Sequence, residues 1–149
     1  MKYTALNEEL FIRFLEAYKQ FYIEQSGNEP DGVYWANFVA FVNINMKNPE
    51  CLFLLAVEGK RVRGFVLAYP IPVFDGIKTV CVDPFYVFPE YRDKKIGLNL
   101  LNILDGWCKQ KGYKRMMGSV KLENAKIWLR KTKLLTGKPK VLVLERFIR

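Results

Sequence analysis

A group of cations stands where a strand-like segment passes into a helix-like one. The stretch Val82–Leu98 begins apolar, contains two prolines, continues through Arg-Asp-Lys-Lys at 92–95 and then enters a periodic apolar segment. Cations are unfavourable at a helix N-terminus, because the helix dipole is positive there. The N–H groups of such a junction, together with arginine and lysine, are typical of anion sites. We therefore expect a bound anion here, with Gly97 allowing a close approach.

The composition excludes several kinds of catalysis. The 149-residue chain has a net charge of +9 and contains no histidine, which excludes Ser-His and Cys-His nucleophiles and histidine-ligated metals. We expect no metal site. Cys51, Cys81 and Cys108 form no Cys-x-x-Cys pair and are expected to be buried, reduced thiols of a cytoplasmic protein. The basic charge balance favours nucleic acid, an acidic protein, an anionic membrane or a phosphorylated cofactor as partner.

Apolar periodicity and turn residues predict the elements that position this junction. Helices are expected at 7–25, 33–47, 96–111 with Gly112 as cap, and 124–133. Strands are expected at 51–58, 61–69, 77–88, 113–121 and 140–148. No linker divides the chain, so residues 1–149 are expected to form a single α/β (α+β) domain. The longest apolar run, Cys51–Val57, is too short to span a bilayer, and no signal-peptide core is visible.

The segment Tyr86-Val-Phe-Pro-Glu-Tyr-Arg-Asp-Lys-Lys-Ile-Gly97 resembles the acetyl-CoA signature of the GNAT family of N-acetyltransferases. In that signature a strand ending in Val-x-Pro-x-(Tyr/Phe)-Arg runs into Arg-x-x-Gly-x-Gly/Ala and a helix. The expected order of elements resembles the family over most of the chain. The resemblance implies a mixed, mostly antiparallel sheet with helices on both faces, splayed central strands, and acetyl-CoA as cosubstrate.

The same resemblance implies roles for individual residues. The backbone of Phe85, Tyr86 and Val87 would pair with the pantetheine arm, and Asn124 would contact that arm, although a plain N-cap role for Asn124 is equally open. Pro84 would help the strand part from its neighbour, the strand 113–121. The residues expected to wrap the pyrophosphate are Arg92, Asp93, Lys94, Lys95, Ile96, Gly97 and Leu98.

Two departures from the family pattern bear on activity. Lys95 stands where the family usually has its first glycine, and its backbone is expected to adopt a helical-turn conformation. Trp128 and Leu129 stand where the family often has a tyrosine that protonates the departing thiolate, and no Gly-Phe follows. The reaction also needs a base that makes the amine neutral. Without histidine, Asp83 acting through water is the candidate, and a turn or bulge role for Asp83 is equally open.

Residues and resemblance together predict transfer of an acetyl group from acetyl-CoA to a primary amine, on a small molecule or a protein, by direct attack in a ternary complex. The acceptor groove is expected from the first two helices and the loop 70–76, in a monomer or homodimer. The alternative is a catalytically degenerate GNAT-fold module whose basic C-terminal face binds nucleic acid or an acidic protein. The cations of that face are Lys121, Lys126, Arg130, Lys131, Lys133, Lys138 and Lys140.

Overall fold

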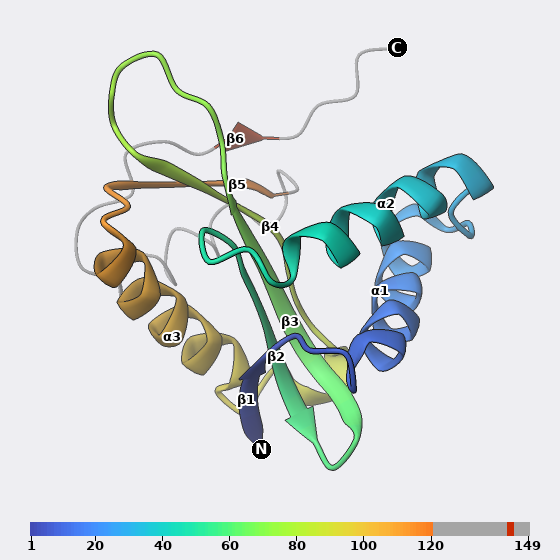
Figure 1. Cartoon of the computed structure of the whole chain (residues 1–149). Helices are drawn as coiled ribbons and strands as arrows, with labels where there is room; N and C mark the ends of the chain where they lie inside the picture. The colour runs from blue at the N-terminus through green and yellow to red at the C-terminus, as the bar shows by residue number, and fades with distance from the viewer. Residues whose placement is uncertain (121–142, 145–149) are drawn as a thin grey trace.

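The described part of the protein forms one mixed sheet with helices on both faces (Figure 1). The structure is a computed structural model that describes residues 1–120 and 143–144. Within these residues the strand order is β1-β2-β3-β4-β5-β6. Neighbours from β1 to β4 are antiparallel, whereas β4–β5 and β5–β6 are parallel. This architecture confirms the mixed, mostly antiparallel sheet that was predicted.

The elements have the following bounds. The strands are β1 (Lys2–Ala5), β2 (Leu52–Glu58), β3 (Arg61–Pro70), β4 (Thr79–Val87), β5 (Arg115–Val120) and β6 (Val143–Leu144). The helices are α1 (Phe11–Ser26), α2 (Gly32–Asn45), the 3-10 turn η1 (Pro89–Tyr91) and α3 (Ile96–Lys111). The helix expected at 124–133 lies outside the described residues, as does the expected strand 140–148 apart from β6.

Alternation along the strands divides the core into two layers. One layer joins α1 and α2 to β2 and β3 through residues such as Phe14, Leu55 and Phe65, each fully buried. The other layer joins α3 to the opposite face through residues such as Val66 and Leu100. Figure 1 shows α3 on one side of the sheet and both N-terminal helices on the other. None of the helices in the described ranges has the length and apolar character needed to cross a bilayer.

The N-terminal segment differs from its prediction. Residues 2–5 form an edge strand on β2 that was not predicted, because four residues are too few to show a period. The first helix begins at Phe11 and not at residue 7. Asn7 caps a preceding turn instead, where its side-chain Oδ1 accepts the N–H of Leu10 at 3.0 Å.

The cysteines are free thiols, but they are less buried than predicted. Cys108 in α3 is buried, whereas Cys51 and Cys81 are half-buried. Burial and the nearby Asp105 charge raise the pKa of Cys108 to about 12, so this thiol is protonated and unreactive at neutral pH. The fold does not depend on cysteine chemistry within the described residues.

Substitution of Gly64 tests how closely β3 approaches the end of β4. A Cβ at Gly64 would lie 3.0 Å from the Tyr86 carbonyl oxygen and 3.3 Å from Val87 Cγ2. We expect Gly64→Ala to lower the free energy of unfolding by about 1–3 kcal/mol through overpacking, as measured by urea denaturation. The control is Gly106→Ala, at an exposed position of α3 where a Cβ meets nothing within 4 Å. This substitution should stabilise the protein by about 0.5–1 kcal/mol. Equal stabilisation by both substitutions would contradict the close approach.

Candidate functional site

β4 and β5 pair over a short distance and then part. Thr79–Val82 pair with Arg115–Gly118, after which β5 pairs with β6. The approach is tight at the last pair, because a Cβ at Gly118 would lie 3.0 Å from the Val82 carbonyl oxygen. From Asp83 onward β4 keeps β3 as its partner while its pairing with β5 has ended. The predicted splay of the central strands therefore starts at Asp83.

A bulge occupies the same point of β4. Val66 and Ala68 of β3 stand opposite Phe85 and Val82, so β4 uses one residue more than β3 over this interval. The extra residue falls at Asp83–Pro84, whose peptide bond is cis. A bulge bends the strand and redirects the side chains that follow it. Asp83 is thus a bulge residue, one of the two roles that the sequence left open.

The bulge changes the face on which each side chain of β4 lies. Val80 and Val82 pack in the α3 layer, and beyond the bulge Val87 packs there too. Tyr86 packs in the layer of α1 and α2. Strand residues alternate between faces, so Asp83, the residue after Val82, lies on the face of α1 and α2. The candidate base therefore faces the two helices that were predicted to bound the acceptor groove.

The charge of Asp83 acts on two tyrosines, Tyr18 and Tyr69. The hydroxyls of Tyr18 and Tyr34 are hydrogen-bonded at 2.5 Å. Burial, together with the bond to Tyr34 and the charge of Asp83, raises the pKa of Tyr18. Burial, the Cys81 thiol and the charge of Asp83 likewise raise the pKa of Tyr69. Both phenols therefore stay protonated at neutral pH and do not serve as bases there.

The junction between η1 and α3 forces one residue into an unusual backbone conformation. Lys95 has φ 59° and ψ 14°, in the left-handed region, so the expectation of a helical-turn backbone is wrong. The chain must reverse direction between η1 and the first turn of α3, and this conformation is the one that glycine adopts freely. A lysine in the left-handed conformation lowers the stability of the folded state by about 1–2 kcal/mol. Its side chain is exposed at the junction.

The first turn of α3 supplies the N–H groups of this junction. Asn99 makes the first helical hydrogen bond, to the Lys95 carbonyl at 3.0 Å, so Ile96–Leu98 have no partner for their N–H groups within the helix. The N–H of Arg92 donates to Pro89, and that of Lys94 to Tyr91. The cradle available to an anion is therefore narrower than the predicted range 92–98, and it centres on the buried Gly97.

Arg92 ties the junction to α1. Its Nε donates to the Val87 carbonyl at 2.9 Å, and its Nη2 lies 3.3 Å from Glu24 Oε1. The Tyr86 hydroxyl donates to Glu24 as well, and the guanidinium stacks 5.5 Å from the Tyr86 ring. Arg92 thus holds the end of β4 in place, which adds a positioning role to its predicted charge. Glu24 was not predicted, because it lies 68 residues from Arg92 and no local pattern marks it.

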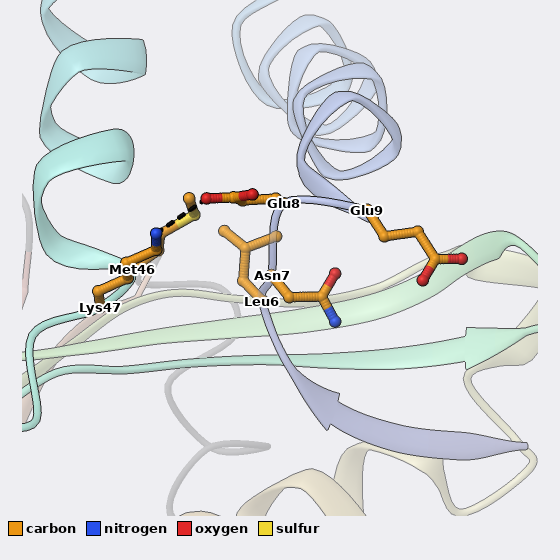
Figure 2. A pocket seen from close by; sticks show the side chains of 6 residues that line it. All are labelled: Leu6, Asn7, Glu8, Glu9, Met46 and Lys47. Atoms are coloured by element: carbon orange, nitrogen blue, oxygen red, sulfur yellow. Dashed lines mark hydrogen bonds and ion pairs between the residues drawn. The ribbon is translucent and has the colours of Figure 1, made fainter.

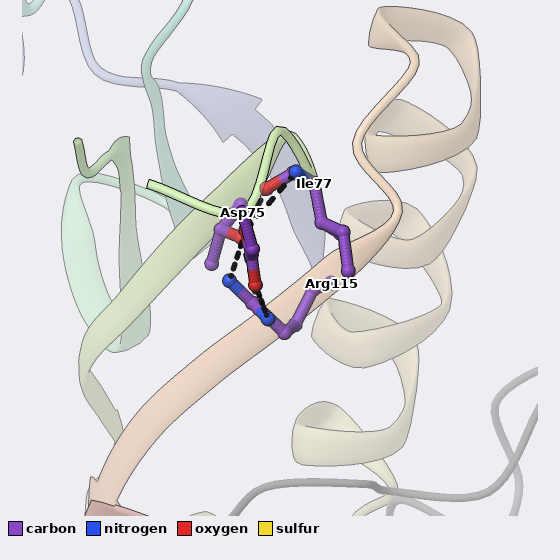
Figure 3. Close-up of polar contacts among 4 residues, drawn as sticks. Asp75, Ile77 and Arg115 are labelled. Carbon is purple, nitrogen blue, oxygen red and sulfur yellow. Dashed lines mark hydrogen bonds and ion pairs between the residues drawn. The ribbon is translucent and has the colours of Figure 1, made fainter. Parts of the chain in front are cut away.

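The loop between β3 and β4 is fixed to β5. Arg115 binds Asp75 with two bonds of 2.6 and 3.2 Å and donates from Nε to Thr79 at 3.0 Å. Asp75 also accepts the N–H of Ile77 at 3.1 Å (Figure 3). The Arg115 guanidinium holds the pKa of Asp75 below its usual range. The loop predicted to border the acceptor groove is therefore anchored at the paired end of β4 and β5.

A hollow elsewhere on the surface has no connection with these residues. It measures 480 Å³ and lies between the start of α1 and the end of α2 (Figure 2). The lining residues are Leu6, Asn7, Glu8, Glu9, Met46 and Lys47. The 2.8 Å ion pair between Lys47 and Glu8 across it is largely exposed to solvent and contributes little to stability.

Asn124, Trp128 and Leu129 lie outside the described residues, as do the cations of the basic C-terminal face.

The chain belongs to the GNAT acetyltransferase family. The family model described as "Acetyltransferase (GNAT) family" matches residues 11–128, which include the bulge, the junction and α3. No curated protein matches the sequence. The family assignment supports acetyl transfer as the general class of reaction.

Solved structures show the same fold at low sequence identity. Glucosamine-6-phosphate N-acetyltransferase from Arabidopsis thaliana is 14% identical with a TM-score of 0.71, covering 99% of this chain and 98% of its own. The aminoglycoside 6'-N-acetyltransferase from Acinetobacter haemolyticus is 17% identical with a TM-score of 0.67, covering 100% of both chains. A predicted acetyltransferase from Clostridium acetobutylicum with acetyl-CoA is 15% identical with a TM-score of 0.72, covering 97% and 95%.

Substitution of Lys95 tests the left-handed conformation at the junction. We expect Lys95→Gly to raise the free energy of unfolding by up to about 1 kcal/mol, because glycine relieves the strain. The matched control is Lys94→Gly, at a position without positive φ, which should destabilise by about 0.5–1 kcal/mol through added chain entropy. Thermal and urea unfolding measure both. Destabilisation of similar size by the two glycines would contradict the conformation described.

Proposed function

We propose that this protein transfers the acetyl group of acetyl-CoA to a primary amine by direct attack in a ternary complex. The observation that carries the proposal is the parting of β4 from β5 at Asp83, one short strand segment before the cationic junction of α3. A candidate base, a segment of β4 beyond its described pairing with β5, and a candidate anion site therefore follow each other along one piece of chain. Their order suits a long cosubstrate with a thioester at one end and phosphates towards the other.

The segment of β4 beyond its described pairing with β5 fits the amide-containing arm of acetyl-CoA. The N–H of Phe88 donates to Arg63 of β3, and the Tyr86 carbonyl faces Gly64 of β3. By alternation, the backbone groups of Phe85 and Val87 face the opposite edge, where pairing with β5 has ended. Since the Val87 carbonyl is held by Arg92, its N–H is the candidate donor to the thioester oxygen.

The junction fits the pyrophosphate of the same molecule. The N–H groups of Ile96, Gly97 and Leu98 lie at the positive end of the α3 dipole. Lys95 adds an exposed charge beside them. A lysine in place of glycine keeps the backbone shape of the turn at a cost in strain, and it offers a charge contact that glycine lacks. The departure from the family pattern is therefore compatible with binding.

The chain's own residues account for the proton and the direction of attack. Acetyl-CoA, when bound, supplies a thioester whose carbonyl carbon an amine can attack. Asp83 accepts the proton of the incoming ammonium, directly or through a water. The N–C bond then forms while the C–S bond breaks and its electron pair leaves on sulfur. The nitrogen releases its second proton to solvent, which gives the neutral amide, and the thiolate takes up a proton from solvent. A thiolate leaves readily enough that this step needs no tyrosine.

Cys81 offers the nearest competing mechanism, an acyl-enzyme. It lies two residues before Asp83 on the same face of β4. Burial and the charge of Asp83 raise the pKa of Cys81, with partial compensation from the Tyr69 hydroxyl. The thiolate is therefore scarce at neutral pH, and a thiol is a poor nucleophile. This state of Cys81 supports direct transfer.

Titration with acetyl-CoA tests the cosubstrate. We expect calorimetry to give a Kd in the micromolar range, which corresponds to a binding free energy of about −8 kcal/mol. Lys95→Glu should weaken the binding of acetyl-CoA by about tenfold or more, because the new carboxylate repels the phosphates. The matched control is Lys60→Glu, an exposed lysine in the hairpin between β2 and β3, which should leave Kd unchanged. An unaltered Kd in Lys95→Glu would contradict the assignment of the junction.

The same titration separates the second candidate function. A protein that fails to bind acetyl-CoA but binds nucleic acid, with affinity falling steeply with salt, would be the degenerate module described above. Reversal of Lys126, Arg130 and Lys131 to glutamate should then abolish nucleic-acid binding. The cations that would serve this second function lie outside the described ranges. The described junction supports the acetyltransferase.

Paired substitutions on β4 test the mechanism. We expect Asp83→Asn to lower kcat by about 10²–10⁴-fold, the usual contribution of a general base, while the Kd for acetyl-CoA stays within about twofold. Cys81→Ala should keep kcat within about threefold of the original. Thiol release at saturating acceptor measures both. An inactive Cys81→Ala that still binds acetyl-CoA would favour an acyl-enzyme over direct attack.

A further inference from the structure

The loop between β3 and β4 presents an aromatic ring to solvent. Residues 71–78 are called the Phe74 loop below. Phe74 is 107% exposed, more than any other large apolar residue in the described ranges, and Ile77 of the same loop is 41% exposed. Figure 1 shows the loop extending beyond the end of the sheet. Single exposed apolar residues are common, so what distinguishes Phe74 is the way in which its loop is held.

Several hydrogen bonds fix the Phe74 loop in one conformation. Asp75, the next residue after Phe74, binds Arg115 of β5 with two bonds of 2.6 and 3.2 Å (Figure 3). Asp75 also accepts the N–H of Ile77 at 3.1 Å, and the Thr79 hydroxyl donates to the Ile77 carbonyl at 2.7 Å. A loop that is ordered beforehand loses less conformational entropy on binding. An exposed ring on such a loop is suited to contact another molecule.

The reaction proposed above makes no use of Phe74. The segment Thr79–Val82, which is paired with β5, separates the Phe74 loop from Asp83, where the strands part. The loop therefore lies at the paired end of β4 and β5, whereas the proposed slot for the cosubstrate lies at the parted end. A contact made by Phe74 is independent of acetyl transfer.

Positive charge predominates around the base of the Phe74 loop. Lys78 and Arg115 are each paired with a carboxylate. Lys111 and Lys114 lie beside them, because the Lys78 ammonium donates to the Lys111 carbonyl at 2.8 Å and the Lys114 N–H donates to the Lys78 carbonyl at 2.9 Å. These four cations and two carboxylates give a local net charge of +2. A partner for the loop should combine an apolar recess with negative charge.

The same chain contains a recess large enough for a phenyl ring. The hollow between the start of α1 and the end of α2 measures 480 Å³ (Figure 2). Leu6 and Met46 contribute apolar surface to its lining. Apolar cavities of about 150 Å³ already hold benzene. The hollow can therefore receive the side chain of a phenylalanine from outside.

The charge of the hollow is opposite to that of the Phe74 loop. Glu8 is paired with Lys47 across it, so the further carboxylate of Glu9 gives the lining a net charge of −1. Arg13, four residues after Glu9, is exposed and does not line the hollow. Copies of a chain with a net charge of +9 repel each other in general. Between the loop of one copy and the hollow of another, the local charges attract.

We propose that the protein forms a two-fold dimer in which the Phe74 ring of each copy occupies the hollow of the other. The ring contacts Leu6 and Met46, and Lys111 and Lys114 lie on the side of the acidic rim. Two-fold symmetry makes this contact twice and closes the assembly. An acidic partner protein or an anionic membrane would suit the loop but leave the hollow unused, whereas a second copy satisfies both surfaces.

Sedimentation across the micromolar range tests the dimer. We expect a dimer that dissociates on dilution, and Phe74→Ala should raise its dissociation constant by about tenfold or more, because two buried rings are lost. The matched control is Val33→Ala, an apolar residue of α2 that is 73% exposed, which should stay within about twofold of the original protein. A chain that stays monomeric up to about 100 μM, or an unchanged dissociation constant in Phe74→Ala, would overturn the proposal.

Charge reversal tests whether the hollow is the surface that receives Phe74. Glu9→Lys should raise the dissociation constant by about tenfold, because it places like charges together at the contact. Glu16→Lys changes the net charge of the chain equally at an exposed position of α1 outside the lining, and should change the dissociation constant by less than about threefold. Equal effects of the two reversals would show general repulsion and contradict docking in the hollow. Thermal unfolding confirms that each variant is folded.

Vesicles distinguish the second copy from a membrane. The monomeric fraction is sedimented with vesicles of phosphatidylglycerol and phosphatidylcholine. Binding to vesicles that is lost in Phe74→Ala, in a protein that forms no dimer, would overturn the proposal in favour of a membrane contact. A dimer that loses affinity in both Phe74→Ala and Glu9→Lys supports it, whether or not the protein binds acetyl-CoA.

Discussion

The end of pairing between β4 and β5 is the constraint on which the rest of the site depends. The described pairing ends at Val82 and Gly118, whereas β4 continues beside β3 to Val87. Gly118 brings β5 against the Val82 carbonyl at the last pair, and the bulge at Asp83 turns β4 just beyond it. An extended molecule with its own amides can complete the edge of β4. The same bulge sends Asp83 to the face of α1 and α2, so one irregularity coincides with the end of the pairing and also orients the candidate base.

A second set of contacts, made by Arg92, fixes the end of β4 against helix α1. Arg92 bonds the Val87 carbonyl and pairs with Glu24 of α1, which also accepts the hydroxyl of Tyr86. The pair is partly exposed, so its contribution to stability is modest, but it links the end of β4, the junction and α1. Lys95, whose backbone is left-handed, comes shortly after Arg92 in the sequence. A strained backbone of this kind persists when the surrounding structure determines it, and here η1 and the buried start of α3 do so.

Sequence reasoning succeeded where the signal is local. Apolar periodicity predicts the strands β2 to β5 and helix α3. The cations at 92–95, followed by Gly97, indicate the position of the junction. It failed for β1, whose four residues become a strand only through pairing with β2. It missed Glu24 and the contact between Tyr18 and Tyr34, because the partners lie 68 and 16 residues apart in sequence. The bulge also interrupts the alternation of side chains along β4. Even-numbered residues such as Val82 face α3 before Asp83–Pro84, whereas the odd-numbered Val87 faces α3 after it.

The distribution of charge connects the two proposed substrates. Arg92, Lys94 and Lys95 gather cations at the junction, where an ammonium would be repelled and a phosphate attracted. On the other face of β4, α2 is uncharged and Asp83 stands beside neutral phenols. A polyanionic cosubstrate and a cationic amine can therefore approach from regions of opposite preference and meet at the bulge. The net charge of +9 alone would favour the anion everywhere, so the proposed selection of an amine depends on the local arrangement around Asp83.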